Sequence, residues 1–190
     1  MKIEIRADGT HICGYVNVPD KKSLPLPLPK YGMVIETVEP KAFEKAINRA
    51  ENIRLTVDHG SNTYASTADG TLKLFEDGIG LYTDAIISDS ELINAAKQKK
   101  IVGWSFGFVP IAQKIEDQKD SPYPLRRILD MELEHVSLII KQEPMYKATS
   151  WEIRDGCTAE ESTDIYNKYE KRIAEIKNAE YQYRVDQLIK

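Results

Sequence analysis

The stretch that decides the fold is Gly103-Trp104-Ser105-Phe106-Gly107, which lies within an apolar run at residues 101–111. A short apolar run of this kind predicts a buried strand. Side chains alternate between the two faces of a strand, so both glycines share a face with Ser105. Glycine weakens a strand and is commonly kept where another backbone or a ligand approaches closely. We therefore expect the Ser105 hydroxyl to project from a cleared face that a peptide can reach.

A histidine stands just past the end of another apolar strand. Residues 53–57 alternate apolar and polar side chains, and Asp58, His59 and Gly60 follow them. Active residues tend to lie where loops begin, although a lone histidine there is more often a plain surface residue. The chain has only three histidines, so a general base has few candidates. A serine hydroxyl and a histidine carried by separate strands are the components of a nucleophile–base pair.

Composition excludes several classes of protein. The 190 residues are 42% hydrophobic and 29% charged, as in an ordinary soluble globular protein with one sizeable core. The net charge of −4 argues against a general nucleic-acid binder. No apolar run approaches the length of a membrane span, and the first residues carry no signal-peptide core. The two cysteines, Cys13 and Cys157, match no metal spacing and favour a reduced cytosolic protein.

The pattern of strands and turns predicts a mostly β protein. Alternation and turn residues predict strands at residues 2–7, 11–18, 33–38, 53–57, 81–87, 101–111, 125–131 and 133–140. The proline-rich residues 24–29 predict an extended loop, with a proline-rich ligand for a partner domain as a less favoured alternative. Pro40 predicts the start of one helix, and the capping box formed by Ser88 and Glu91 predicts a second helix that runs to Lys99. The expected fold class is α+β, mostly β: an antiparallel barrel or sandwich flanked by helices.

The last part of the chain has a different character. Residues 162–190 are charged, contain no proline or glycine, and place several apolar side chains near one helical face. This pattern predicts a domain at residues 1–155 and a charged helical tail at residues 156–190. The apolar stripe drifts along the tail, which favours packing on one partner surface over a long coiled coil.

Strand alternation also ranks two neighbouring side chains near the end of the domain. In Leu133-Glu134-His135-Val136-Ser137-Leu138, His135 and Ser137 share a face with Leu133, whereas Glu134 points to the other face. Only one of Glu134 and His135 faces a site in regular geometry. A bulge in the strand would make Glu134 the alternative.

Taken in order, these segments resemble the prohead proteases of tailed phages, which are related to the herpesvirus maturational proteases, or assemblins. The resemblance begins at Gly14-Tyr15 and continues through Pro40-Lys41-Ala42-Phe43 and Asp77-Gly78-Ile79-Gly80-Leu81. It includes His59, the Ser105 motif and the Val136-Ser137 strand, and extends to about Ala148. It implies a herpesvirus-protease-like β-barrel and a serine endopeptidase that cleaves scaffold and capsid precursors.

The resemblance also implies roles for individual residues. Ser105 is the expected nucleophile and His59 the expected general base. The third member falls at His135, where the phage enzymes commonly have an acidic residue and the assemblins have histidine. The donors of the oxyanion hole stay open between the backbone N–H groups near Phe106 and Gly107 and the guanidinium groups of Arg126 and Arg127, which are more often paired with acidic neighbours.

The resemblance implies no cofactor and no metal, no nucleic-acid or membrane partner, and a location inside the viral procapsid in the host cytoplasm. Scaffold protein and major capsid protein are the expected partners, with the tail docking to one of them or to a second copy of the chain. Two rival functions remain. A non-catalytic assembly protein that keeps the fold is favoured by His135 in place of a carboxylate. A metal-binding module built on Asp58, His59 and His135 matches no compact ligand spacing.

Overall fold

The computed structural model describes residues 10–147, 149 and 152–154. Ten strands and two helices lie in this part of the chain. They are, in order, β1 (Thr10–Asn17), β2 (Leu26–Leu28), β3 (Gly32–Val38), α1 (Ala42–Arg49), β4 (Arg54–Val57), β5 (Ala65–Ser66), β6 (Leu72–Glu76), β7 (Leu81–Ile87), α2 (Ser90–Lys97), β8 (Gly103–Glu116), β9 (Leu125–Ile139) and β10 (Glu152–Arg154). The expected strand at residues 2–7 and the expected tail helix lie outside the described residues.

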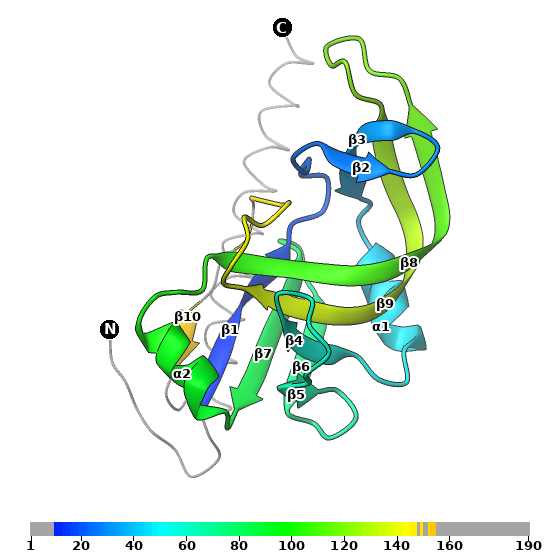
Figure 1. The fold of residues 1–190 in the computed structure, drawn as a ribbon. Helices are drawn as coiled ribbons and strands as arrows, with labels where there is room; N and C mark the ends of the chain where they lie inside the picture. Colours follow the sequence, from blue (N-terminus) through cyan, green and yellow to red (C-terminus); the bar gives the residue numbers. More distant parts are fainter. Residues whose placement is uncertain (1–9, 148, 150–151, 155–190) are drawn as a thin grey trace, which may run out of the picture. The chain divides into compact units, whose positions relative to one another are not determined.

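The strands form two sheets (Figure 1). One sheet has the order β10-β1-β7-β6, and the other has the order β2-β3-β9-β4-β5 with β8 paired to β9. The mostly β class with two helices is confirmed. The pairings of the described strands leave both sheets open, so closure into a barrel stays a prediction. The expectation of a mostly antiparallel sheet needs amendment around β9, because β3 and β4 both run parallel to it.

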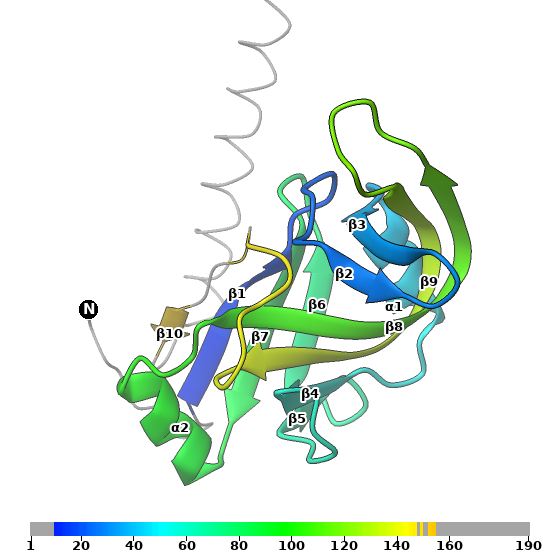
Figure 2. The same ribbon diagram turned by 45° about the horizontal axis from the view of Figure 1, so that its top comes forward.

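Strand β9 pairs with three other strands of the second sheet, β3, β4 and β8. It is a single 15-residue strand, so the prediction of two strands, at residues 125–131 and 133–140, was wrong. Along one edge it pairs with the 14-residue β8, and together they form the long curved hairpin seen in Figure 2. Among the described strands β8 pairs only with β9. Strand β8 continues past Ile111 because the polar residues that follow keep both faces of this ribbon compatible with solvent.

The other edge of β9 is shared by two short strands. Strand β3 pairs with residues 125–128, and β4 pairs with residues 135–138. In the gap between them, the Arg49 guanidinium of α1 donates to the Met131 carbonyl oxygen at 2.9 Å and pairs with the Asp130 carboxylate. The helix that connects β3 to β4 therefore also binds one backbone carbonyl of the β9 edge between the two strands.

Both helices begin later than the sequence predicts. Helix α1 begins at Ala42 rather than Pro40, because Lys41 adopts a left-handed conformation with φ of 73°. The Glu76 carboxylate of β6 accepts the backbone N–H groups of Lys41 and Glu44 and so caps this helix. Helix α2 is capped by Asp89, whose carboxylate accepts the Leu92 N–H at 2.7 Å. The predicted Ser88 capping box was therefore wrong by one residue.

The proline-rich segment is also more regular than predicted. Leu26-Pro27-Leu28 forms β2 and pairs antiparallel with residues 32–34 of β3. Proline cannot donate a ladder hydrogen bond, but it is tolerated on an edge strand, and β2 is the outermost strand of its sheet. The prediction of a plain loop was wrong at these three residues.

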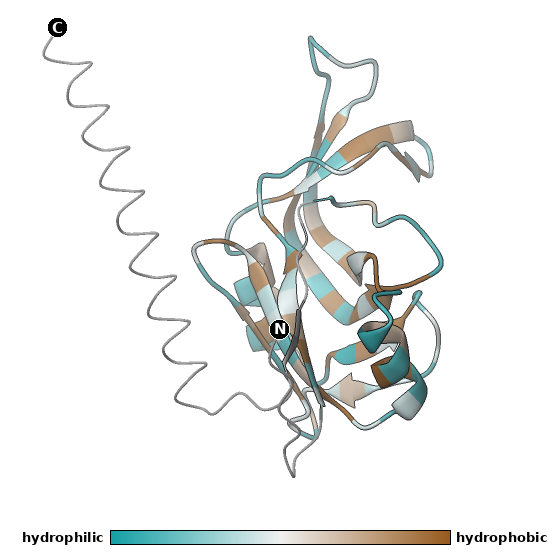
Figure 3. Ribbon diagram, turned by 90° about the vertical axis from the view of Figure 1, so that its left-hand side faces the viewer, coloured by the Kyte–Doolittle hydropathy of each residue, from teal (hydrophilic) through white to brown (hydrophobic). Residues whose placement is uncertain are grey.

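The core brings together apolar side chains from both sheets and both helices. Its largest fully buried members include Trp104 of β8, Phe43 of α1 and Ile12 of β1. Figure 3 shows apolar and polar segments alternating along the strands, as expected for strands with one buried face. Trp104 and Phe106 are buried while Ser105 between them is half-buried, so Ser105 lies on the face of β8 turned away from the core.

Candidate functional site

The turn that carries His59 is held in an uncommon backbone conformation. Asp58 and His59 follow β4 and both have a positive φ, 47° and 57°. Non-glycine residues rarely adopt this left-handed region, and such residues persist only where their surroundings fix them. Here the Asp58 N–H donates to the Leu138 carbonyl oxygen at 2.9 Å, and the Gly60 N–H donates to the Val57 carbonyl oxygen at 2.8 Å.

Two side chains complete the support of this turn. One Asp58 carboxylate oxygen accepts the backbone N–H groups of Ile140 and Lys141 at 2.8 and 3.1 Å. The fully buried Ser137 hydroxyl accepts the His59 N–H at 3.0 Å. Ser137 positions the histidine backbone, a role that the sequence does not predict. The one signal in the sequence was strand alternation, which places Ser137 on the same face as His135.

Strand register brings Ser105 to the same place. Ser105 of β8 lies opposite Ser137 of β9, and Thr56 of β4 lies opposite Ser137 on the other edge. The His59 Nε2 atom is 2.9 Å from the Ser105 Oγ atom. The His59 Nδ1 atom is 2.9 Å from the His135 Nε2 atom, and the two imidazole rings meet edge to face with their centroids 5.2 Å apart. The structure thus brings the three site residues expected from the sequence into one hydrogen-bonded chain.

The strand is bulged beside His135, yet His135 rather than Glu134 faces the site. Gly107 pairs with His135 and Phe108 pairs with Leu133, so Glu134 has no partner on β8. Glu134 is exposed, whereas Leu133 and Val136 both belong to the buried core. The extra residue returns Leu133 to the core face, so the prediction that Leu133 shares a face with His135 was wrong.

The glycines of the Ser105 motif make room for the protein itself. A Cβ atom at Gly107 would lie 2.1 Å from Cε1 of the His135 ring. A Cβ atom at Gly103 would lie 3.0 Å from Cγ of Pro144 and 2.9 Å from Oγ1 of Thr149. The expectation of a face cleared for a peptide is therefore replaced by a more specific reason: Gly107 is the seat of the His135 imidazole.

The surroundings of both imidazoles favour the neutral form. Partial burial lowers the pKa of His59 from its usual 6.5, against a smaller raising effect of the Asp58 carboxylate. Partial burial also lowers the pKa of His135, and the positive charges that His59 and Arg54 can present act in the same direction. Glu134 opposes this effect, but less strongly.

The remaining charged candidates are occupied elsewhere. Arg126 forms a buried ion pair with Glu36 at 2.7 Å, and Arg127 pairs with Glu39. His11 lies in β1, where its Nδ1 atom is 2.8 Å from the Asp84 carboxylate. In the described part of the chain, no group of three histidine, cysteine or acidic side chains is arranged to hold a metal ion. The metal-binding alternative therefore gains no support from the geometry.

The seat of His135 is directly testable. Gly107→Ala should displace the imidazole, because the added methyl group and the ring cannot both occupy the same space. We expect a loss of turnover of about 100-fold, the size of effect that a misplacement of about 1 Å can cause. Turnover on a peptide or protein substrate measures the loss, and circular dichroism checks the fold.

A double variant separates the seat from general damage to β8. Gly107→Ala in a His135→Ala background should cost much less than in the wild type, because the cavity left by the imidazole accepts the methyl group. Equal losses in the two backgrounds would contradict this explanation of Gly107.

Comparisons with known proteins place the chain in a family. No curated protein sequence matches it. Among solved structures, it resembles the protease of Kaposi's sarcoma-associated herpesvirus (KSHV) in complex with a hexapeptide phosphonate inhibitor: identity is 15%, the TM-score is 0.45, and the match covers 80% of this chain and 66% of that one. A second KSHV protease structure, with an allosteric inhibitor, gives 11% identity, a TM-score of 0.42, and coverage of 86% and 91%. The sequence itself matches the caudovirus prohead serine proteases over residues 1–165, more than four fifths of its length, and the chain belongs to that family.

Proposed function

We propose that this capsid-maturation protease uses Ser105 as its nucleophile, His59 as its general base and His135 as the group that orients His59. The observation that carries this assignment is the continuous hydrogen-bonded chain from Ser105 Oγ through both nitrogens of His59 to His135 Nε2. A nucleophile and a base within hydrogen-bond reach, with the base oriented by a third group, form the arrangement required for covalent catalysis.

The positions of the protons follow from these contacts. To accept the hydroxyl proton of Ser105, His59 must have an unprotonated Nε2 atom, so its proton lies on Nδ1. That N–H then donates to the Nε2 atom of His135, whose own proton lies on Nδ1. When Ser105 attacks the scissile carbonyl carbon, its proton passes to His59, which returns it to the leaving amine. Water resolves the acyl-enzyme by the same steps in reverse.

A histidine in the third position changes the electrostatics of the step. A neutral imidazole stabilises the imidazolium that forms at His59 less than a carboxylate does. The nearest supporting charge is Asp58, whose carboxylate acts on His59 while accepting two backbone N–H groups. His135 contributes mainly by fixing the tautomer and the direction of the ring, and Gly107 gives it the space to do so.

The substrates and location follow from the family. A prohead protease acts within the procapsid, and we propose that this chain cleaves scaffold and capsid precursor proteins there, in the host cytoplasm. Self-association and docking through residues 156–190 belong to the same proposal. In the described residues, no helix is long and apolar enough to cross a membrane. A non-catalytic assembly protein is the second candidate, and the histidine in the acidic position is the one feature that favours it.

Removal of the nucleophile separates these two candidates. Co-expression with the candidate scaffold and capsid proteins should give processed products with the wild type and none with Ser105→Ala, because loss of the nucleophile costs about 10⁶-fold in turnover. The fold should be retained, since a half-buried hydroxyl on the face opposite the core contributes little to stability. Processing by a folded Ser105→Ala variant would remove Ser105 from the mechanism and favour the assembly protein.

The pH dependence follows from the direction of the two pKa shifts. Catalysis requires neutral His59, and protonation of His135 would remove the acceptor for the His59 N–H. Because both pKa values are lowered, the acid limb of kcat/KM should lie below pH 6.5. The two sites are coupled, so the limb reports an apparent value for the pair.

A matched variant tests the cause of this shift. Arg54→Gln removes a charge that lowers the pKa of His135, so its acid limb should move toward higher pH. Initial rates between pH 4.5 and 8 measure both proteins. A wild-type limb at or above pH 6.5 would contradict the neutral pair.

Two single variants compare the neighbours at the bulge, His135 and Glu134. His135→Ala should lower kcat clearly while leaving residual activity, with a loss no larger than the roughly 10⁴-fold cost of a misdirected histidine in other triads. Glu134→Gln should retain activity near that of the wild type, because Glu134 is exposed and lies outside the hydrogen-bonded chain. Steady-state rates of the two variants on one substrate measure the ranking. The reverse order would assign the third position to Glu134.

A further inference from the structure

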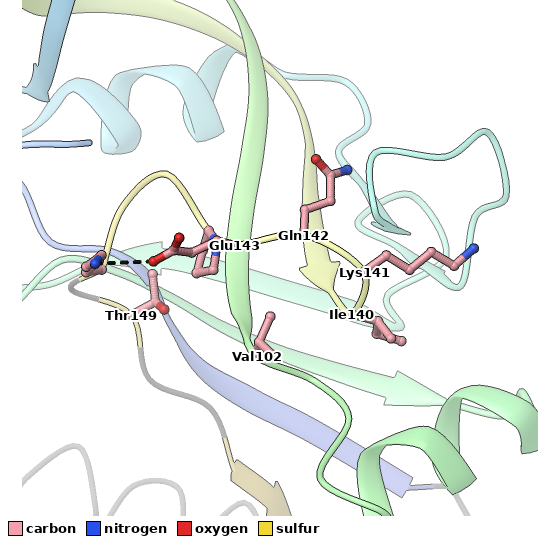
Figure 4. Close-up of a pocket in the computed structure, with 8 residues that line it drawn as sticks. Val102, Ile140, Lys141, Gln142, Glu143 and Thr149 are labelled. Atoms are coloured by element: carbon pink, nitrogen blue, oxygen red, sulfur yellow. Dashed lines mark ion pairs between the residues drawn. The ribbon is translucent and has the colours of Figure 1, made fainter. Parts of the chain in front are cut away.

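A pocket of about 570 Å³ lies where β8 begins and β9 ends. It is lined by Val102, Ile140, Lys141, Gln142, Glu143, Pro144, Lys147 and Thr149. Figure 4 shows Val102 between Ile140 and Lys141 on one side and Thr149 on the other. A pocket of this volume has room for a large side chain and the backbone next to it. None of the three residues assigned to catalysis lines it.

The pocket adjoins the nucleophile along β8. Gly103 shares the face of Ser105, and a side chain at Gly103 would meet Pro144 and Thr149. The wall of the pocket therefore stands over the strand two residues before Ser105, a distance of roughly 7 Å along a strand. An extended peptide bound at Ser105 reaches this wall within two or three residues.

The wall is fixed to the rest of the protein. The Val102 N–H donates to the Ile139 carbonyl oxygen at 2.8 Å, and the Leu24 N–H donates to the Met145 carbonyl oxygen at 2.8 Å. The Asp58 carboxylate binds the N–H groups of Ile140 and Lys141, so the turn that carries His59 is tied directly to the pocket. A ligand in the pocket is thus held in register with the hydrogen-bonded chain at Ser105.

The lining is mixed: Val102, Ile140 and Pro144 are apolar, and Lys141, Gln142, Glu143, Lys147 and Thr149 are polar or charged. The Val102 side chain is 52% exposed, and Ile140 and Pro144 are its apolar neighbours in the lining. Glu143 and Lys147 neutralise each other in an ion pair of 3.2 Å. A single exposed valine is ordinary, but Val102 lines a pocket, and two other residues of its lining, Pro144 and Thr149, lie against Gly103, two residues before Ser105.

We propose that this pocket is a substrate subsite that accepts an apolar side chain of the peptide, two or three residues from the scissile bond. The inference rests on the proposed function of Ser105 and His59 and adds the residues that select the substrate. Burial of Val102 against an apolar side chain favours such peptides, and a charged or strongly polar side chain would lose its hydration there.

A specificity profile tests the proposal. A library of peptides of mixed sequence is incubated with the full chain, and mass spectrometry identifies the cleaved bonds. The wild type should enrich Leu, Ile, Val, Met or Phe at one position within three residues of the cleaved bond. In Val102→Glu this enrichment should fall, with the ratio of kcat/KM for a Leu peptide over its Lys counterpart reduced by about tenfold or more.

A matched control isolates the pocket from general effects of an added charge. Ile111 of β8 is as exposed as Val102, at 51% against 52%, but Val102 comes just before β8 begins and Ile111 stands six residues beyond Ser105. Ile111→Glu should keep the wild-type ratio. Structural damage alone would lower both rates in proportion and leave the ratio unchanged, so an unchanged ratio in Val102→Glu overturns the subsite.

A second measurement separates this proposal from the proposed function. A small phosphonylating reagent, which carries no peptide, labels an activated serine, and the labelled residue of the wild type is identified by mass spectrometry. Labelling of Ser105 without an apolar preference among cleaved peptides, or with no cleavage, overturns the subsite alone. Absence of both labelling and cleavage overturns the assignment of Ser105 and the subsite with it.

Discussion

The structure depends on the register of three strands, β8, β9 and β4. One edge of β9 sets Ser105 opposite Ser137 and Gly107 opposite His135, and its other edge sets the end of β4 so that His59 follows. Side chains alternate with period two, so a slip by one residue would turn every one of these groups to the opposite face. The apolar side chains that alternate with them are buried, and core burial therefore enforces the same register that aligns the site. The relative positions of Ser105, His59 and His135 are therefore fixed by the packing of the core.

The residues of the site were predictable from the sequence to different extents. Ser105 stands in a motif and His59 stands at the end of a strand, and both are local signals. The first and last residues of β7 also agree with the alternation of residues 81–87. The bulge at Glu134 was not predictable, because alternation assumes a regular ladder and the extra residue is defined only by the partner strand. The role of Gly107 was missed for a related reason. A glycine signals close approach, but the sequence does not say that the approaching group is the imidazole of the chain's own His135. Long-range pairing also decided the cap of α1, which Glu76 supplies from another strand.

The hydrogen-bonded chain of the site contains no carboxylate. Its third position holds a neutral ring, and the nearby carboxylate of Asp58 is used to anchor backbone N–H groups. Arg126 lies on β9, the strand that also carries His135, and its guanidinium donates to the buried Glu36 carboxylate. Glu36 also accepts the Tyr146 hydroxyl at 2.7 Å. Burial raises the pKa of both Glu36 and Tyr146, and the arginine opposes this rise. The buried ion pair of Arg126 and Glu36 thus belongs to the scaffold of the domain and lies outside the hydrogen-bonded chain of the site.

The long hairpin of β8 and β9 has a consequence for how the protein behaves at high local concentration. Among the described strands β8 pairs only with β9, and a strand with one unpaired edge is a template on which another chain can add. Strand β8 interrupts that template with its own sequence. Pro110 removes a backbone donor, the ladder shifts between Pro110 and Ala112, and charged side chains at Lys114 and Glu116 follow. These features disfavour the addition of a strand from another chain along the outer half of the hairpin.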